Sequence, residues 1–338
     1  MAHLNKEFQI SPQHKVAFSM DKGEIDVRGW DEDLCKVVVE SDQEVVFTHK
    51  KKINRLFLSA GEGENKKVQM YLPRTCNIFI NGSYLDLSVA NFDYKLKVEN
   101  GNGKISVTNF LGDISLEQSK GSIELVSNCG RLKADLGNVN TEVFNHTGDL
   151  TIDAGSGDLY VKGLDGAANL VLAKGNHTVT ESKGSLCFSS AGEIDITSCR
   201  FTQIRGVGAG NTVLELPKTL ILNYDIVRNG DMCLFIPPNS SLNLEAFFDS
   251  VDNKVESLKT EKNPGFYRIN KGAEWMAEVK LQGKHLDIQS KNDECADKYE
   301  SNTSGSKEAL RILKMVEEGD LDPQEAEELL EAIDKEVE

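Results

Sequence analysis

The sequence has no long apolar run and no N-terminal segment of the kind that directs secretion. A transmembrane helix needs about 18 or more apolar residues in a row, and no such run occurs in this chain. Residues 1–7, MAHLNKE, lack the basic start and the apolar stretch of a signal peptide. We therefore expect no integral membrane segment and a cytoplasmic location, with the cell envelope as the alternative.

The cysteines and histidines also lack the spacings that bind metal. There are seven cysteines, an odd number, with no C-x-x-C pair, and the six histidines show no H-x-x-x-H or mixed Cys/His spacing. A disulfide framework is not expected, and reduced thiols in a cytoplasm fit best. No catalytic, cofactor-binding or metal-binding residue is predicted. The cysteines are Cys35, Cys76, Cys129, Cys187, Cys199, Cys233 and Cys295.

Positive charge is scarce in this chain. It carries 38 Lys and Arg against 54 Asp and Glu, which gives a formal net charge of −16. The short basic run His49–Lys52 is interpreted as a solvated turn. Nucleic-acid binding usually requires a clustered Lys/Arg surface. The net negative charge of the chain would repel both a nucleic acid and an anionic membrane. No nucleic-acid partner is therefore expected.

What the sequence does contain is a nine-residue repeat, visible from Cys76 to Ala191. When these residues are written in rows of nine, the fifth place of every row is apolar. Hydrophobic residues make up 39% of the chain, so a column of this kind does not arise by chance. The fifth-place residues are Ile80, Val89, Val98, Val107, Leu116, Leu125, Ala134, Val143, Ile152, Val161, Leu170, Val179 and Phe188.

A second column, two places earlier in each row, is apolar apart from Thr141 and His177. Apolar residues two apart, separated by polar ones, are typical of a strand with one buried and one wetted face. Each row is therefore predicted to hold one short strand. The residues of this column are Ile78, Leu87, Leu96, Ile105, Ile114, Ile123, Leu132, Thr141, Leu150, Leu159, Ala168, His177 and Leu186.

Glycine opens most rows from residue 103 onward. A glycine at a fixed place suits a corner where φ is positive or where two backbones approach closely. Strands joined by such corners predict a mainly β fold, either a β-solenoid or a similarly stacked β-repeat. Two rows per coil would give about 18 residues and three about 27, and the periodicity does not choose between them. The glycines are Gly103, Gly112, Gly121, Gly130, Gly148, Gly157, Gly166, Gly175 and Gly184.

Four parts are predicted along the chain. Residues 1–75 read as a β-rich N-terminal cap, and residues 76–290 as the β-repeat or solenoid. One residue is missing from the repeat after Ala191. Residues 291–306 are polar and read as a linker, and residues 307–338 follow as a separate module.

Residues 307–338 are predicted to form a small α-helical hairpin. Gly319 ends the first helix, and Asp322-Pro323 supplies an N-cap and a first-turn proline for the second. Helices this short are stable only when their apolar faces are buried against other residues. We expect a second copy of the chain or another protein to bury them, the alternatives being that the helices cover each other or lie back on the solenoid. The predicted interaction residues are Leu310, Leu313, Val316, Leu329, Leu330 and Ile333.

Several segments together resemble a known family. The strand segments Gly23–Val27, Val68–Pro73 and Met232–Pro237, and the hairpin Leu310–Leu330, are similar to the bacterial "putative adhesin" β-strand repeat family of unknown function. Several of its members carry a SHOCT-like helical hairpin. The resemblance implies a regular β-stack without known catalytic residues, an association with envelope-stress systems, and a helical module that mediates oligomerisation.

The expected function is therefore that of a non-enzymatic scaffold that assembles copies or recruits partners through its C-terminal hairpin. The alternatives are a surface adhesin or carbohydrate-binding module and, less favoured, a polysaccharide-active β-helix enzyme. Such an enzyme would collect charged side chains on one solenoid face. His177 stands in an inward column and is interpreted as a hydrogen-bonded structural residue. The outward residues considered for a catalytic face are Asp113, Glu124, Lys133, Asp149, Asp158 and Lys162.

Overall fold

The computed structural model divides the chain into two compact units, Met1–Ser290 and Lys291–Glu338. The second unit lies outside the described residues, and with it the predicted linker, the predicted hairpin and all six predicted interaction residues. Every described element is a β-strand. The described residues are 2–11, 13–41, 47–52, 55–60, 66–217, 222–237, 242–255, 258–263, 266–271 and 278–290.

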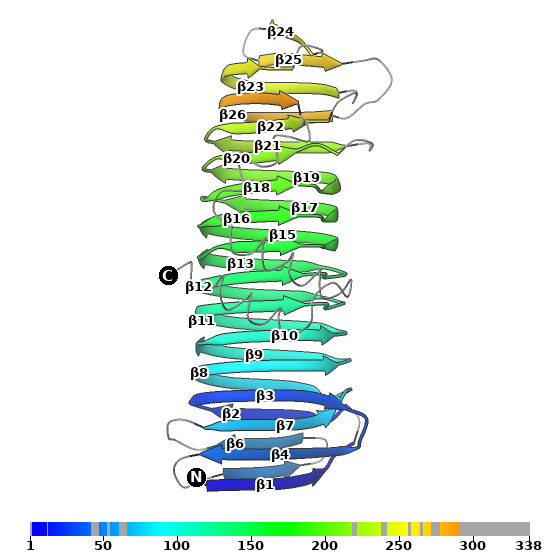
Figure 1. Ribbon diagram of the computed structural model, residues 1–338, viewed down its shortest axis with the longest axis vertical. Coiled ribbons are helices and arrows are strands. Elements are labelled where there is room, and N and C mark those ends of the chain that lie inside the picture. Colours follow the sequence, from blue (N-terminus) through cyan, green and yellow to red (C-terminus); the bar gives the residue numbers. More distant parts are fainter. Residues whose placement is uncertain are drawn as a thin grey trace, which may run out of the picture. The chain divides into compact units, whose positions relative to one another are not determined.

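The strands of the first unit stack along one axis (Figure 1). The N-terminal strands are β1 (Ala2–Gln9), β2 (Lys15–Met20), β3 (Lys22–Trp30), β4 (Leu34–Ser41), β5 (Phe47–Lys52), β6 (Arg55–Ala60) and β7 (Lys67–Pro73). The next are β8 (Asn77–Phe92), β9 (Lys95–Asn102), β10 (Lys104–Phe110), β11 (Asp113–Val126), β12 (Leu132–Phe144), β13 (Leu150–Ser156), β14 (Leu159–Lys162), β15 (Asp165–Lys174) and β16 (Asn176–Thr180).

The stack continues to Ser290 with a further set of strands. They are β17 (Lys183–Ser190), β18 (Glu193–Thr197), β19 (Arg200–Ala209), β20 (Thr212–Glu215), β21 (Asn223–Asn229), β22 (Met232–Ile236), β23 (Leu242–Asn253), β24 (Lys259–Asn263), β25 (Phe266–Lys271) and β26 (Glu278–Ser290).

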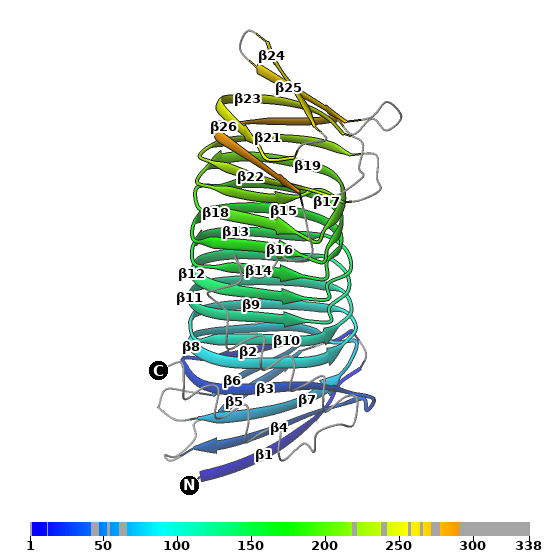
Figure 2. The same ribbon diagram turned by 45° about the horizontal axis from the view of Figure 1, so that its top comes forward.

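The repeat closes into a coil after two rows. Ile114 pairs with Leu132 and Leu125 with Val143, all in parallel register, so each strand lies beside the one two rows later. The 27-residue alternative is therefore wrong. Alternate rows form two faces on either side of the core (Figure 2). We call the face containing β9, β13, β15, β17, β19 and β21 the first face, and the face containing β10, β14, β16, β18, β20 and β22 the second. The strands β8, β11 and β12 contribute their first halves to the first face and their second halves to the second.

Both predicted apolar columns point into one continuous core. Every residue of the two columns is buried, including the polar exceptions Thr141 and His177. Leu125, near the middle of the stack, has no exposed surface. Burial of apolar area is the main favourable contribution to folding. Each coil of the repeat therefore stabilises the next one by burying apolar side chains against it.

The predicted glycine corners are confirmed. Gly130 has a φ of 129°, and a Cβ at this position would meet the backbone carbonyl of Gly112 in the preceding coil. A side chain is therefore excluded both by the backbone conformation and by the neighbouring coil. Each of the nine glycines named above has a positive φ.

One of the two corners of each coil has a second left-handed residue, three positions before its glycine, as Asn109 precedes Gly112. Most of these residues are Asn or Ser, which tolerate that conformation better than other residues do. The corner is stabilised from inside where Asn128 accepts a hydrogen bond from the Phe110 amide and donates one to the Val107 carbonyl. The left-handed residues are Asn91, Asn109, Ser127, Asn145, Gly163, Glu181 and Ser198.

The residue missing after Ala191 is compensated eleven positions later. Gly184 pairs with Phe201, but Ser185 pairs with Gln203, so Thr202 is a bulge that restores the register. Without this bulge, every inward side chain of β19 after Phe201 would point outward, because the side-chain period of a strand is two.

Antiparallel strands close both ends of the stack. At the N-terminal end β1 pairs with β4 and β5 pairs with β6, and at the C-terminal end β24 and β25 form an antiparallel pair. The basic run His49–Lys52 lies in β5, so its interpretation as a turn is wrong. Lysines on an edge strand discourage pairing with another chain. The predicted division at residue 75 stays a prediction, and β2 pairs across it with β8.

Candidate functional site

Outward side chains on the first face form straight columns along the solenoid. Alternate residues of each strand point outward, and parallel pairing stacks them about 4.8 Å apart from one strand to the next. One such column runs through Glu99, Glu117, Asp135 and Asp153 and continues into Val171. The chemistry of the face therefore changes along its length.

The N-terminal part of this face is densely charged. Lys97 Nζ lies 2.6 Å from Glu99 Oε1 and 3.3 Å from Glu117 Oε1, bridging two strands. Hydrogen bonds to the two carboxylates raise the pKa of Lys97, and the bond from Lys97 lowers the pKa of Glu99. Exposed ion pairs of this kind contribute little stability, and they leave the acid column only partly neutralised.

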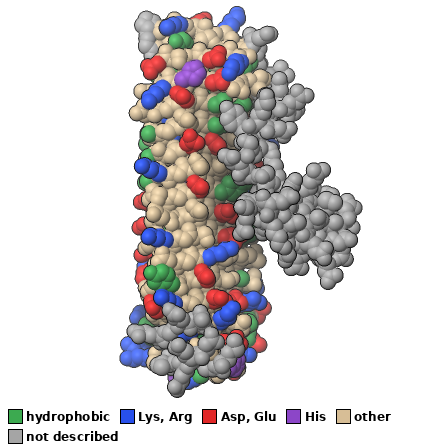
Figure 3. All heavy atoms as spheres, turned by 60° about the vertical axis from the view of Figure 1, so that its left-hand side comes forward, with side chains coloured by type: hydrophobic (Ala, Val, Ile, Leu, Met, Phe, Trp, Pro, Cys, Tyr) green, Lys and Arg blue, Asp and Glu red, His purple; other side chains and the backbone are tan. Residues whose placement is uncertain are grey.

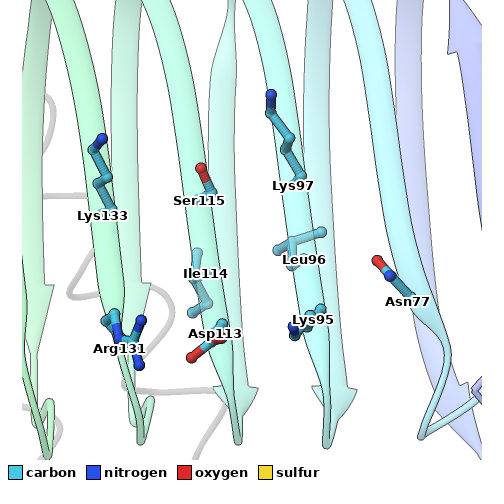
Figure 4. A pocket seen from close by; sticks show the side chains of 9 residues that line it. All are labelled: Asn77, Lys95, Leu96, Lys97, Asp113, Ile114, Ser115, Arg131 and Lys133. Atoms are coloured by element: carbon cyan, nitrogen blue, oxygen red, sulfur yellow. The ribbon is translucent and has the colours of Figure 1, made fainter.

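A shallow depression of about 230 Å³ lies over β9, β11 and β12. Figure 4 shows Lys97 and Lys133 on either side of the short Ser115, and Lys95 and Arg131 on either side of Asp113. The cationic side chains and the serine hydroxyl are the groups that hold a carboxylate or a phosphate. We call this depression the basic notch. Its lining residues are Asn77, Lys95, Leu96, Lys97, Asp113, Ile114, Ser115, Arg131 and Lys133.

A second depression, of about 510 Å³, lies on the second face near the N-terminal end. Glu24 and Lys67 in its lining form an ion pair at 2.8 Å, with Asp26 and Asp86 nearby. Its charges are mixed. Acidic and basic side chains are interspersed in the same way over the described residues of the surface in Figure 3.

The part of the first face formed by β15, β17 and β19 is almost free of charge. Residues 167–173 on β15, 185–191 on β17 and its corner, and 203–209 on β19 contain one charged side chain, Arg205. We call the outward side chains of these three segments the uncharged patch. They are Ala167, Asn169, Val171, Ala173, Ser185, Cys187, Ser189, Ala191, Gln203, Arg205, Val207 and Ala209.

The charged residues considered for a catalytic face do not share one face. Because a coil contains two rows, the core separates them into two sets. Asp113, Lys133 and Asp149 lie on the first face. Glu124, Asp158 and Lys162 lie on the second. The six residues therefore do not form one site.

His177 points inward as predicted, but the predicted hydrogen bond is not there. It is buried, and neither ring nitrogen has a hydrogen-bond partner among the described residues. Burial lowers the pKa of His177, with an opposing effect from Asp158 and a further lowering from Arg228. The imidazole is held neutral inside the core and does not reach solvent as a general base would.

Arg228 on β21 is a buried cation that the sequence reasoning missed. Its side chain is 2% exposed, and burial lowers the pKa of Arg228 to about 10. The sequence could have revealed it through the alternation of the strand. Tyr224 and Ile226 occupy inward positions, and Arg228, two residues further on, occupies the next one. A charged residue at an inward position is costly unless its donors find acceptors.

The described cysteines are free thiols with different surroundings. Cys35, Cys76 and Cys199 are buried, and burial raises the pKa of each to about 12. Cys187, on β17, is exposed. Over the described residues no group of three or more His, Cys, Asp or Glu could hold a metal ion, and no helix is long and apolar enough to cross a membrane.

Comparison with known proteins identifies the family. Residues 7–206 match the family model described as Toastrack DUF4097. The chain belongs to the Toastrack DUF4097 family. In this Toastrack chain, residues 307–336 also match a SHOCT-like domain, so the resemblance seen in the sequence is confirmed at both ends. No curated protein matches the chain.

The solved structures that match this chain have very different sequences. A "putative cell adhesion protein" from Clostridium sporogenes is 11% identical, with 86% of this chain and 100% of that chain covered and a TM-score of 0.21. A "putative adhesin" from Bacteroides fragilis is 13% identical, with coverage of 70% and 97% and a TM-score of 0.33. A "putative lipid binding protein" from Parabacteroides distasonis is 10% identical, with coverage of 85% and 97% and a TM-score of 0.30.

Proposed function

We propose that this Toastrack protein is a non-catalytic β-repeat scaffold that binds protein partners in the cytoplasm, in an envelope-stress response. Residues 307–338 assemble copies of the chain or recruit the partner. The observation that carries the proposal is the first face, a long flat array of outward columns fixed to one continuous core. Flat surfaces of this kind suit protein binding, whereas small-molecule sites are concave and enclosed.

The chemistry of the described residues supports a non-catalytic role. Acid–base catalysis needs a titratable group that reaches substrate with its pKa near the working pH. His177 is buried within the core, and the thiol of Cys199 has its pKa raised to about 12 by burial. Neither group is placed to act as a base or a nucleophile.

The assembly role rests on the C-terminal sequence. Residues 307–336 match the SHOCT-like domain, and the segment contains the six apolar residues named above at helical spacing. Burying each would contribute about 1.5–3 kcal/mol when fully covered, which a two-helix hairpin alone does not achieve. Residues 307–338 carry 12 acidic against 4 basic side chains. Association through them is therefore expected to strengthen with salt, as the repulsion between copies is screened.

Affinity capture from the native organism tests this role. The full-length chain is the bait, and the comparison is a full-length variant with Leu313→Asp and Leu329→Asp. We expect a defined set of partners with the wild type and their loss with the variant, while the β-repeat melts as before. Retention of the same partners by the variant would contradict a recruiting role for the C-terminal segment.

A surface adhesin or carbohydrate-binding module is the alternative, and the basic notch favours it. Lys95, Arg131 and Lys133 around Ser115 offer the donors that an acidic sugar requires. The two functions predict different locations. A protease added to intact cells would leave a cytoplasmic protein whole and would remove a surface protein.

A further inference from the structure

The first face continues toward the N-terminal end of the stack through β2, β6 and β5, which follow the first half of β8. Two neighbouring outward columns run across these strands and on through β9, β11 and β12. Among the described residues of these two columns, Asp113 is the only acid. Figure 4 shows the end of the columns over β9, β11 and β12. We call the cations of the two columns the basic strip. They are Lys15, Lys50, Lys52, Arg55, Lys95, Lys97, Arg131 and Lys133.

The second face shows no such segregation of charge. There Lys67 lies 2.8 Å from Glu24, and Lys104 lies 3.8 Å from Glu124. Each of these two cations is balanced by an acid on a neighbouring strand. In the basic strip, the only ion pairs among the described residues are those of Lys97 with the acid column. The other cations of the strip are therefore available to an anionic ligand.

Protection of a sheet edge accounts for only part of the strip. Lys50 and Lys52 lie on the edge strand β5, where lysine discourages pairing with another chain. Lys15, Lys95 and Arg131 lie on β2, β9 and β12, each of which is paired on both sides and has no edge to protect. In a chain with a net charge of −16, cations gathered on one surface point to a ligand of negative charge.

We propose that the basic strip binds an acidic segment of the partner protein, lying along the axis of the solenoid. The inference rests on the proposed function, because it assigns to the partner a docking surface on the first face and a charge. The strip crosses β5, β6, β2, β8, β9, β11 and β12, which at about 4.8 Å per strand gives a length of about 29 Å. Its two columns lie about 7 Å apart, the distance between alternate residues of a strand. These dimensions fit about nine residues of one extended chain.

The acid column favours a protein over a polymer with one sign of charge. Glu99 and Glu117 stand beside the strip, two residues along their strands from Lys97 and Ser115. A nucleic acid or an anionic membrane carries negative charge, so the part of it that lies over the acid column is repelled. A protein segment can place acids over the strip and a Lys or Arg over the acid column, and it then complements both.

Charge reversal within the strip tests the proposal. The probe is a short fluorescein-labelled peptide of Glu-Glu-Ser repeats, titrated with the full-length chain by fluorescence anisotropy in about 50 mM salt. Lys15→Glu with Lys95→Glu changes two exposed residues of the strip and should weaken binding at least about tenfold. Lys120→Glu with Lys174→Glu is the matched control, since both residues are exposed, lie outside the strip and change the net charge equally. The control should weaken binding by about twofold or less.

The same titration contains the results that would overturn the proposal. A wild type that does not bind the peptide, or equal losses in the two double variants, shows that the strip is not an anion-binding surface. Oligothymidylate and vesicles containing phosphatidylglycerol are the competing probes. If either binds the wild type more tightly than the peptide does, and loses affinity in Lys15→Glu with Lys95→Glu, the strip takes that ligand and the assignment to a protein segment is wrong.

Affinity capture with the strip variant separates this inference from the proposed function. If Lys15→Glu with Lys95→Glu recovers the same partners as the wild type in the same amounts, the strip is not their docking surface, while the scaffold role stands. If the wild type captures no defined partner, the scaffold role fails. The peptide titration then decides by itself whether the strip binds an acidic segment.

Discussion

The guanidinium of Arg228 lies over the ring of Phe188, with Cζ 5.7 Å from the ring centroid, in the interior of the solenoid. Its Nη1 and Nη2 donate hydrogen bonds of 2.6 Å to the carbonyls of Ser190 and Gly192. Ser190 is the last residue of β17 and Gly192 lies two residues beyond it, at the corner where the repeat loses one residue. The buried cation thus stabilises the place where the coil departs from its regular register.

Replacing Arg228 should expose this dependence. Arg228→Met keeps the volume approximately but removes the side-chain donors to the Ser190 and Gly192 carbonyls. The Gly192 carbonyl keeps a hydrogen bond from the Ser190 hydroxyl at 3.3 Å, whereas the buried Ser190 carbonyl loses its side-chain donor. We expect the free energy of unfolding, measured in urea, to fall by about 1–3 kcal/mol. Arg131→Met on the exposed face is the control, with a change of about 0.5 kcal/mol or less. Equal effects of the two substitutions would contradict the assigned role.

His177 should make stability depend on pH. Burial holds its folded-state pKa below the ordinary value of 6.5, so the unfolded chain takes up a proton first as the pH falls. Stability is therefore lost from about pH 6.5 downward and levels off once the folded state is also protonated. His177→Leu, which matches the apolar residues of its column, should reduce the loss between pH 7.5 and about 5.5 in urea titrations. His3→Asn at the surface is the control. If His177→Leu leaves the pH dependence of the free energy of unfolding unchanged, His177 is not its source.

Leu125 tests the inward register of the repeat. Leu125→Asp buries an unpaired carboxyl group in a fully enclosed position, and we expect a loss of about 4 kcal/mol or more, enough to abolish a cooperative melt. Glu124→Asp on the neighbouring outward position should change the melt little. A normal cooperative transition of Leu125→Asp, followed by circular dichroism, is the result that this register forbids.

Gly130 tests the glycine corner. Gly130→Ala places a Cβ against the Gly112 carbonyl and forces alanine to a φ of 129°, at a cost of about 1–3 kcal/mol in strain. Gly155→Ala is the matched control, because Gly155 has no positive φ and its Cβ would make a tight but not overlapping contact, 3.1 Å from the Gly137 carbonyl oxygen. Thermal melting should separate the two variants clearly, and an equally stable Gly130→Ala would argue against the corner.

Thr202 tests the register compensation. Deleting this bulge residue should cost about 3 kcal/mol or more, because the side chains that follow it in β19 exchange faces. Inserting one serine between Ala191 and Gly192 should have a similar cost. Both changes together restore an unbroken repeat, so the double variant should regain most of the stability in urea unfolding. Additive losses in the double variant would show that the two irregularities are unrelated.

The family could be recognised from the sequence because its repeat depends on residues that are close to one another along the chain. Alternating residues such as Ile114 and Leu116 mark the buried side of a strand wherever that strand lies, and Gly112 marks the turn before it. Both signals depend on neighbours within a few residues. The candidate surfaces are different, since the uncharged patch joins residues about 18 apart that become neighbours only when the coil closes.

The sequence by itself determined that this chain is a stack of short strands with one apolar face each, because periodicity two and a recurring glycine have few other physical meanings. Only the tertiary structure decided that two rows make a coil, since a nine-residue period is satisfied equally by two or three rows. That decision separates Asp149 from Asp158 on opposite faces and stacks Val171 beside Ser189. It also places Arg228 against Ser190 and Gly192, a contact set by coil closure and not by any local pattern.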